Sequence, residues 1–184
     1  MAHNEQVSTR EANMEFQKTE SETRENRANR GERHTANVAA EMQIRGRMHE
    51  FSQAFIAKDL DKIMSFYAPD VVAFDIVPPL QVVGKDAYRK SWEKYLPMMT
   101  KVEEHETHDL HVTAGEDIAF TYCLAHMVGI TSEGTKMDTW MRHTAGFRKI
   151  DGEWLVTHEQ LSVPIEMESN KALWELKPQS EFVH

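Results

Sequence analysis

Polar side chains that could line a binding site interrupt an apolar segment in the second half of the chain. Residues 118–130 alternate in the manner of a β-strand, and one face is bulky and apolar except for Tyr122 and His126. A buried polar group needs a hydrogen-bond partner, which could be a ligand or a neighbouring residue. The pattern therefore supports two interpretations equally: the two residues line a pocket, or they belong to an ordinary core.

The same mixture of aromatic and titratable side chains returns on the two strands predicted next. Trp140 shares a face with Arg142, and His158 shares a face with Gln160 on the last strand. Such faces suit a polar-lined cavity in a curled sheet, where these groups could hold a ligand. A solvated face or a dimer interface is the alternative, because Trp and Arg are enriched at interfaces.

Three histidines at a spacing of three residues raise the question of a metal site. His105, His108 and His111 stand among acidic residues, in a segment that runs into a predicted strand. This spacing could gather ligands on one face of a helix, but a strand sends alternate histidines to opposite faces. We therefore predict a charged edge strand and no metal. No phosphate-binding or nucleophile motif is present, and Cys123 lies in mid-strand among small residues, so no cofactor is predicted.

The composition narrows the class of protein. The chain has 184 residues, with 21 basic and 30 acidic side chains and a net charge of −9. An acidic chain without a basic tract has no general attraction for phosphate, so nucleic acid is not an expected partner. The single cysteine excludes an intrachain disulfide, and no apolar stretch resembles a secretory signal or approaches the ~20 residues of a membrane span. We therefore expect a soluble, cytoplasmic protein with no membrane partner.

The polar residues are concentrated in the first 40 positions. This segment contains no Ile, Leu, Trp or Tyr, so it cannot bury enough surface to offset the entropy of ordering. We predict a disordered or loosely helical polar arm at residues 1–40, which is either a partner-binding tail or a solvated extension. Residues 41–184 then form a single domain of ordinary size.

Helical periodicity dominates the start of this domain, and strand-like alternation dominates the rest. Apolar spacing predicts a helix at 42–57, a second helix that Asp59 caps and Pro69 ends, and a third helix after Gly84. A short helix is also predicted at 167–176. The predicted strands cover residues 71–76, 107–113, 118–130, 136–150 and 153–163. This order indicates an α+β fold with helices on one face of an antiparallel sheet.

Three stretches of the sequence resemble the nuclear transport factor 2-like superfamily. They are residues 58–75 (KDLDKIMSFYAPDVVAFD), 84–92 (GKDAYRKSW) and 140–164 (WMRHTAGFRKIDGEWLVTHEQLSVP). The second and third stretches are similar to the SnoaL-like and ketosteroid-isomerase-like branch. The resemblance implies a cone-shaped fold in which a curled antiparallel sheet packs on three N-terminal helices around a conical pocket. It also implies a homodimer that pairs through the sheet.

The resemblance transfers one catalytic position to this chain. In ketosteroid isomerase a proton-shuttling Asp ends the first strand, and the matching position is Asp75. The alternative is that Asp75, at the end of its strand, only caps a turn. The oxyanion-hole tyrosine of that enzyme matches Phe51, which has no donor, so a steroid isomerase with the same machinery is not expected. Other donors would then stabilise the developing charge. The predicted catalytic residues are Asp75, Arg142 and His158. The predicted ligand pocket comprises Phe51, Trp92, Tyr95, Tyr122, His126, Trp140 and Gln160.

These observations lead to one principal hypothesis and two alternatives. The chain is predicted to bind a small hydrophobic molecule and to act as a cofactor-free isomerase, cyclase or hydrolase that uses acid–base chemistry on a carbonyl compound. If it is an enzyme, an isomerase or a lyase or cyclase of the ketosteroid-isomerase-like type is expected. The alternatives are a non-catalytic ligand-binding domain and a dimerisation or assembly domain, because one fold hosts many functions.

Overall fold

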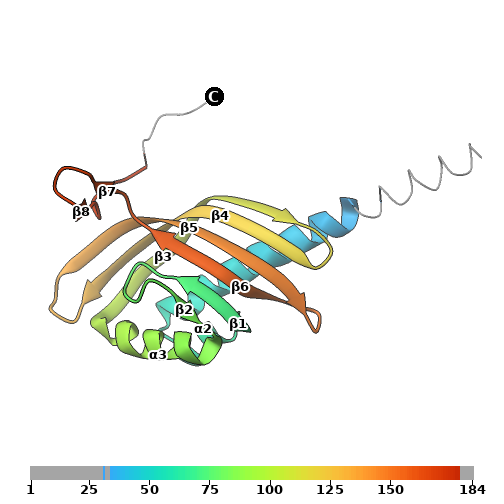
Figure 1. Ribbon diagram of the computed structural model, residues 1–184, viewed down its shortest axis with the longest axis horizontal. Coiled ribbons are helices and arrows are strands. Elements are labelled where there is room, and N and C mark those ends of the chain that lie inside the picture. Colours follow the sequence, from blue (N-terminus) through green and yellow to red (C-terminus); the bar gives the residue numbers. More distant parts are fainter. Residues whose placement is uncertain (1–30, 32–33, 179–184) are drawn as a thin grey trace, which may run out of the picture.

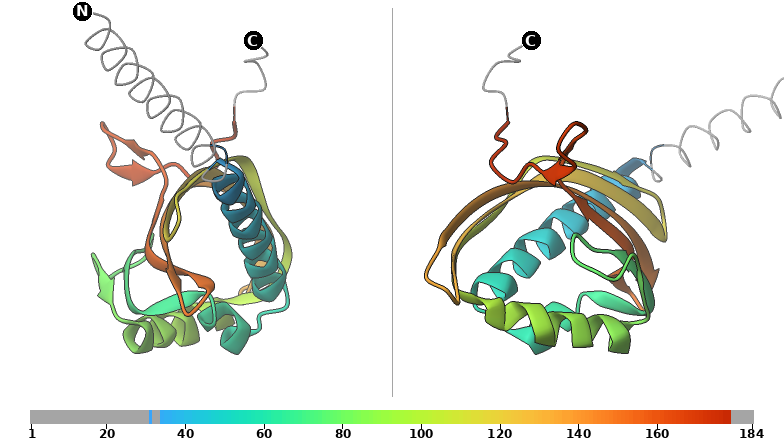
Figure 2. Two further views of the ribbon diagram at one scale, coloured as in Figure 1. Left: turned by 90° about the vertical axis from the view of Figure 1, so that its right-hand side faces the viewer. Right: turned by 60° about the vertical axis from the view of Figure 1, so that its left-hand side comes forward.

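The computed structural model describes residue 31 and residues 34–178, which form a curled sheet around a long helix (Figure 1). The sheet has six strands in the order β2-β1-β6-β5-β4-β3. The long helix, residues 34–56, runs along the concave side of the sheet, and α2 and α3 lie at one end (Figure 2). The α+β cone and its three helices, expected from the sequence, are therefore confirmed.

α2 and α3 begin at the positions that the sequence predicts, whereas the long helix begins earlier than the predicted residue 42. In α2 (Leu60–Met64) the carboxylate of Asp59 accepts a hydrogen bond from the Lys62 N–H at 3.0 Å, which caps the first turn. α3 (Lys85–Tyr95) follows Gly84 and continues into the short 3-10 helix η1 (Leu96–Met98). α2 is shorter than predicted, because Tyr67 already belongs to the first strand.

β1 and β3 are longer than predicted, whereas β4, β5 and β6 lie within one residue of the predicted bounds. One pairing differs from the expected antiparallel pattern. β1 runs in parallel beside β6, so the sheet is mixed. The crossover through α3 carries the chain to the far edge of the sheet, and the meander that follows brings β6 back alongside β1. The main strands are β1 (Tyr67–Phe74), β2 (Val82–Val83), β3 (Met99–Ala114), β4 (Ile118–Thr131), β5 (Lys136–Ile150) and β6 (Glu153–Ser162).

The helix predicted at 167–176 is wrong. This segment forms a small hairpin of β7 (Ile165–Glu166) and β8 (Lys171–Ala172). Asn170 lies in the connecting turn with φ of 55°, in the left-handed region that asparagine tolerates better than most residues. The turn chemistry therefore outweighs the weak helical spacing of the tail.

The concave face of β4 carries the small side chains of that strand. Ala119, Thr121 and Cys123 are buried, whereas Ile118 and Phe120 are 65% and 49% exposed on the convex face. The interpretation that the bulky face lines a pocket is therefore wrong. Small side chains allow the long helix to approach β4 closely, and helix and strand share one hydrophobic core.

An irregularity in β6 reverses the alternation of that strand. The pairing of β5 with β6 shifts between Val156 and His158, so β6 contains one extra residue, in the manner of a β-bulge. Val156 and Glu159 both face the concave side as a result, and both are buried. His158 and Gln160 consequently turn to the convex side, whereas strict alternation would have put them with Val156.

The boundary predicted for the polar arm falls inside the long helix. Residues 34–40 are helical, and Ala40 is 7% exposed. Residues 1–30, 32–33 and 179–184 lie outside the described residues, so the prediction for most of the arm stays a prediction. Among the described helices, none is long and apolar enough to cross a membrane.

Candidate functional site

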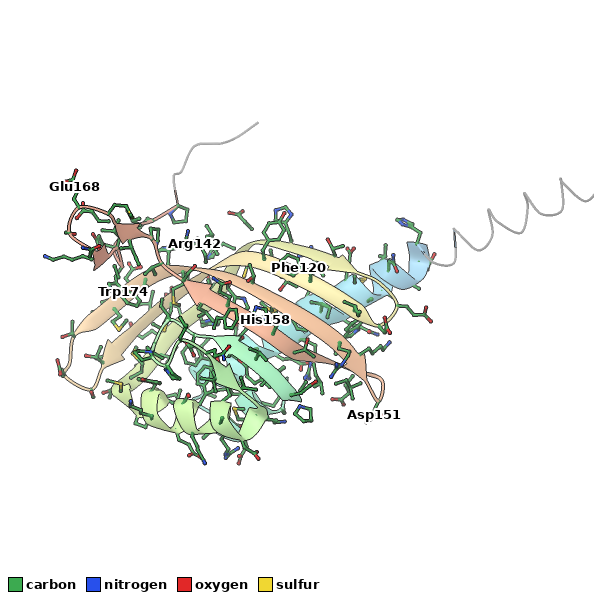
Figure 3. The ribbon with its side chains drawn as sticks, in the orientation of Figure 1. Phe120, Arg142, Asp151, His158, Glu168 and Trp174 are labelled. Atoms are coloured by element: carbon green, nitrogen blue, oxygen red, sulfur yellow. The ribbon has the colours of Figure 1, made fainter. Side chains whose placement is uncertain are left out.

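A cavity of about 590 Å³ lies between the concave face of the sheet and the helices. Its walls are mainly apolar: Phe51 and Phe55 come from the long helix, Trp92 from α3 and Met141 from β5. Trp174, labelled in Figure 3, also lines it from the C-terminal segment. A cavity of this size and lining suits one small organic ligand.

In the cavity wall the buried carboxylate of Glu159, on β6, is surrounded by several hydrogen-bond donors. Its Oε1 accepts a bond from the Tyr67 hydroxyl at 3.0 Å and a shorter one from the Tyr88 hydroxyl. Its Oε2 lies 3.4 Å from Nε2 of His143. Glu159 is 4% exposed, and these partners, drawn from β1, α3 and β5, compensate for its removal from water.

The charge state of this cluster follows from the pKa of His143. Burial alone would lower that pKa, but hydrogen bonds to Cys123 and Glu159 and the charge of Glu159 outweigh it and raise the pKa to about 9. At neutral pH the imidazolium therefore pairs with the carboxylate. Burial, followed by the nearby charge of Glu159, raises the pKa values of Tyr67 and Tyr88 well above 10, so both phenols remain hydrogen-bond donors.

Asp75, directly after β1, adds a second carboxyl group to the cavity. Its Oδ1 accepts the Ile76 N–H at 2.7 Å, and its Oδ2 lies 3.2 Å from the Tyr88 hydroxyl. Burial, and then the charge of Glu159, raises the pKa of Asp75. The Tyr88 hydroxyl has a single proton, which it donates to Glu159 in the shorter of its two contacts. The contact between Tyr88 and Asp75 is therefore a hydrogen bond when Asp75 is protonated and donates to the Tyr88 oxygen. The two carboxyl groups are thus connected through one phenol.

The imidazole of His105, on β3, is another polar group in the cavity wall. Its Nδ1 lies 2.9 Å from the Ser52 hydroxyl of the long helix. Burial, with a smaller contribution from the charges of His143 and His126, lowers the pKa of His105 to about 4. The two histidines of the cavity therefore differ at neutral pH: His143 is charged and His105 is not.

The structure brings together four of the residues that the sequence predicts for the site. Asp75, Phe51, Trp92 and Tyr95 all line the cavity. The Tyr95 hydroxyl also donates to the Pro78 carbonyl at 3.1 Å. The aromatic face predicted for the third helix is thus part of the cavity wall.

The other predicted site residues do not line the cavity. Arg142 of β5 and His158 of β6 are labelled in Figure 3. The cavity lining includes neither of them, nor Tyr122, His126, Trp140 and Gln160. The strand pairing places all six on the convex side of the sheet. Several of these side chains are satisfied there by neighbours. His158 Nδ1 lies 2.8 Å from the Val72 carbonyl oxygen, and His126 Nε2 lies 2.9 Å from an Asp138 carboxylate oxygen. The imidazole of His126 also stacks on Trp140, with ring centroids 4.3 Å apart.

Sequence reasoning missed the residues that form the polar centre of the cavity: Tyr67, Tyr88, His105, His143 and Glu159. A signal was present in two of the strands. His143 is the only ionisable residue on its face between Met137 and Phe147, and Glu159 is the only one on a face with Leu161. An isolated ionisable group on an apolar strand face indicates a buried site better than a mixed face does.

The histidine run of β3 splits between the two faces of the sheet. His105 faces the cavity and His108 faces outward, as the spacing predicts, while a register shift between His108 and His111 alters the alternation beyond it. On the convex side the ligating atoms of Glu106, His108 and His126 lie within 4.8 Å of one another. These residues could hold a divalent cation such as Zn²⁺. The absence of a metal site stays a prediction.

Comparison with known proteins is consistent with this fold. The profile of the SnoaL-like domain matches residues 44–166. An NTF2-like protein of unknown function from Pseudomonas putida KT2440 is 37% identical, with a TM-score of 0.70 over 77% of this chain and 98% of that chain. No curated protein sequence matches significantly.

Two more distant structures share the fold. A ketosteroid isomerase-like protein from Erwinia carotovora atroseptica SCRI1043 is 18% identical, with a TM-score of 0.58 over 66% of this chain and 94% of that chain. A protein of unknown function with a cystatin-like fold from Nostoc punctiforme PCC 73102 is 16% identical, with a TM-score of 0.55 over 65% and 87% of the two chains. Because the domain profile covers most of the chain and the fold agrees, this protein belongs to the SnoaL-like family of NTF2-like proteins.

Proposed function

We propose that this protein is an enzyme that performs cofactor-free acid–base chemistry on a hydrophobic carbonyl compound, with Asp75 as the group that moves the proton. The observation that carries the proposal is a half-buried carboxyl group with a raised pKa at an apolar cavity, connected through Tyr88 to a buried ion pair. A raised carboxyl pKa brings a general base closer to neutral pH, where proton transfer is most effective.

The chemistry that suits this arrangement is proton removal from a carbon next to a carbonyl. Ionised Asp75 takes the proton, and the electron pair moves onto the carbonyl oxygen as an enolate. The Tyr88 hydroxyl can turn from Glu159 to that oxygen, while Tyr67 and His143 continue to hold Glu159. Protonated Asp75 then returns the proton at another carbon, which gives isomerisation, or loss of a neighbouring leaving group gives elimination.

The name of one structural relative fits this reaction class. The Erwinia protein is described as ketosteroid isomerase-like, and isomerisation by that route moves a proton next to a carbonyl. Arg142 and His158 have no part in stabilising the charge in this reaction, since both side chains lie outside the cavity. In their place the cavity offers the phenol of Tyr88.

Hydrogen exchange at carbon tests the proposal without knowledge of the product. We expect apolar ketones that bind the full chain to exchange their α-protons for deuterium in D₂O, as followed by proton NMR. Asp75→Asn, which keeps the shape but removes the base, should slow exchange by about 100-fold or more. The matched control is Asp117→Asn, an exposed residue remote from the cavity, which should exchange at the wild-type rate. Equal exchange in the wild type and Asp75→Asn would refute the assignment of Asp75.

A second candidate function is assembly through the convex face of the sheet. Ile118, Phe120 and Tyr122 point to one side of β4 and are 65%, 49% and 48% exposed, which is unusual for three apolar or aromatic side chains in a row on one strand face. We propose a second copy of the chain as the partner of this surface. With a net charge of −9, neither nucleic acid nor an anionic membrane is proposed as a partner, and a cytoplasmic location is proposed because of the single cysteine.

A further inference from the structure

The hydrogen-bond geometry around His105 determines which ring nitrogen carries the proton. The Ser52 hydroxyl donates to the Met48 carbonyl oxygen at 3.2 Å, as serines in helices often do. A hydroxyl has one proton, so both contacts of Ser52 are made only when Nδ1–H of His105 donates to the Ser52 oxygen. Nε2 then carries a lone pair and no proton.

In the part of the chain that the structure describes, the lone pair of Nε2 has no protein donor. Among the described residues, no backbone or side-chain group donates to Nε2, although the ring lines the cavity and is only half-buried. The low pKa of His105 keeps the ring neutral at physiological pH, so Nε2 remains an acceptor. A ligand that donates a hydrogen bond to Nε2 would therefore make an interaction with the cavity wall that an apolar analogue cannot make.

The surroundings of His105 favour a flat ligand. Phe55 meets the imidazole edge to face, with centroids 5.0 Å apart and planes at 88°, and Phe51 lies 6.0 Å away. The Trp92 indole packs 5.6 Å from Phe55 in a similar edge-to-face contact. A cavity wall made of aromatic rings in perpendicular contacts offers both faces and edges to a further ring.

We propose that the ligand of this cavity is a hydroxylated aromatic compound whose hydroxyl group donates a hydrogen bond to Nε2 of His105. The carbonyl part of the same molecule faces Asp75, and this second half of the assignment rests on the function proposed above. His105 acts here as a specificity residue that binds substrate and takes no proton. An amine N–H shares the donor chemistry of the hydroxyl, and the ligands of the test separate the two.

The test compares matched ligands on the full chain by isothermal titration calorimetry. Para- and meta-hydroxyphenyl ketones are measured against analogues with a methyl or an amino group in place of the hydroxyl. We expect the best hydroxyl compound to bind roughly 3- to 10-fold more tightly than its methyl analogue, the range expected for one additional neutral hydrogen bond. An amino compound that binds more tightly than its hydroxyl counterpart would overturn the hydroxyl assignment.

Two variants test whether the preference for hydroxyl compounds depends on His105. His105→Phe keeps an aromatic ring without an acceptor, and it should bind hydroxyl and methyl compounds with affinities within about twofold of each other. His111→Gln, on the exposed part of β3 outside the cavity, is the matched control and should keep the wild-type preference. A preference that persists in His105→Phe would overturn the proposal.

A third variant and a spectroscopic measurement test the same proposal if His105→Phe fails to fold. Ser52→Ala removes the acceptor that selects the tautomer, and it should weaken the hydroxyl preference while methyl compounds bind as before. Nitrogen-15 NMR of the wild type should show Nδ1 protonated and Nε2 unprotonated, with Nε2 responding to the hydroxyl ligand. The opposite tautomer would overturn the proposal. If the protein prefers hydroxyl ligands but does not exchange their α-protons, only the proposed reaction is refuted. If it exchanges α-protons but shows no preference for hydroxyl ligands, only the role of His105 is refuted.

Discussion

The pKa values of the two cavity histidines are shifted in opposite directions, and the shift of His143 has the clearer consequence for stability. Its pKa in the folded protein is about 9 against an ordinary value of 6.5, a difference that corresponds to about 3 kcal/mol. A raised pKa means that the folded state holds the proton more tightly than the unfolded chain. The stabilisation is therefore complete below pH 6.5 and is lost as the pH rises to about 9.

His105 contributes in the opposite sense and in a different pH range. Its pKa is lowered from 6.5 to about 4, so its stabilisation is complete above pH 6.5 and is lost as the pH falls toward 4. Asp75 partly offsets this loss in acid, because its raised pKa stabilises the folded state when the carboxyl is protonated. The alkaline side, where His143 changes charge, is thus the cleaner measurement.

The assay is urea unfolding of the wild type and His143→Gln over a series of pH values. The difference in the free energy of unfolding between the two proteins should shrink by about 3 kcal/mol from pH 6.5 to about 9. NMR should show His143 as an imidazolium and His105 as a neutral ring at neutral pH. His111→Gln, an exposed histidine, serves as the control and should show no such trend. A constant difference, or a His143 that loses its proton below pH 6.5, would refute the account of the Glu159 cluster.

Two further predictions concern the sheet. Phe120→Lys should convert a dimer into a monomer in size-exclusion chromatography with light scattering while leaving the melting temperature of the monomer nearly unchanged; a wild-type monomer would contradict the proposed interface. Gly129→Ala should lower the free energy of unfolding by about 1–3 kcal/mol, because its Cβ would lie 2.6 Å from the Lys101 carbonyl oxygen of the paired strand. The control is Gly46→Ala in the long helix, where an added Cβ would meet no atom within 4 Å, and it should raise the free energy of unfolding by up to about 1 kcal/mol. Equal effects of the two substitutions would contradict the packing described for Gly129.

Local sequence signals were reliable where one interaction dominates. Asp59 accepts the hydrogen bond that starts α2, and Gly84 precedes α3, because capping and backbone freedom act over a few residues. The turns that join β4, β5 and β6 follow from Gly134 and Gly152, both with positive φ. At residues 167–176 local spacing predicted the wrong structure. The segment has the apolar spacing of a helix, but it forms a hairpin whose turn contains Asn170 in the left-handed conformation.

Strand faces were harder to assign, because which face is buried depends on what packs against it. β4 has an apolar bulky face and a small-residue face, and alternation alone cannot say which one meets the helix. The close approach of the long helix selects Ala119 and Cys123, so Tyr122 and His126 turn outward. One extra residue in β6 has the same consequence for His158 and Gln160.

The sequence by itself determined the family, the order of helices and strands, and the place of Asp75 at the end of the first strand, because these depend on local pattern and on similarity along the chain. Only the tertiary structure decided which ionisable groups meet in the cavity. Tyr67, Tyr88, His143 and Glu159 come from four different elements. Their contacts are set by the curl of the sheet and the β6 irregularity, which depend on packing between segments far apart in the chain.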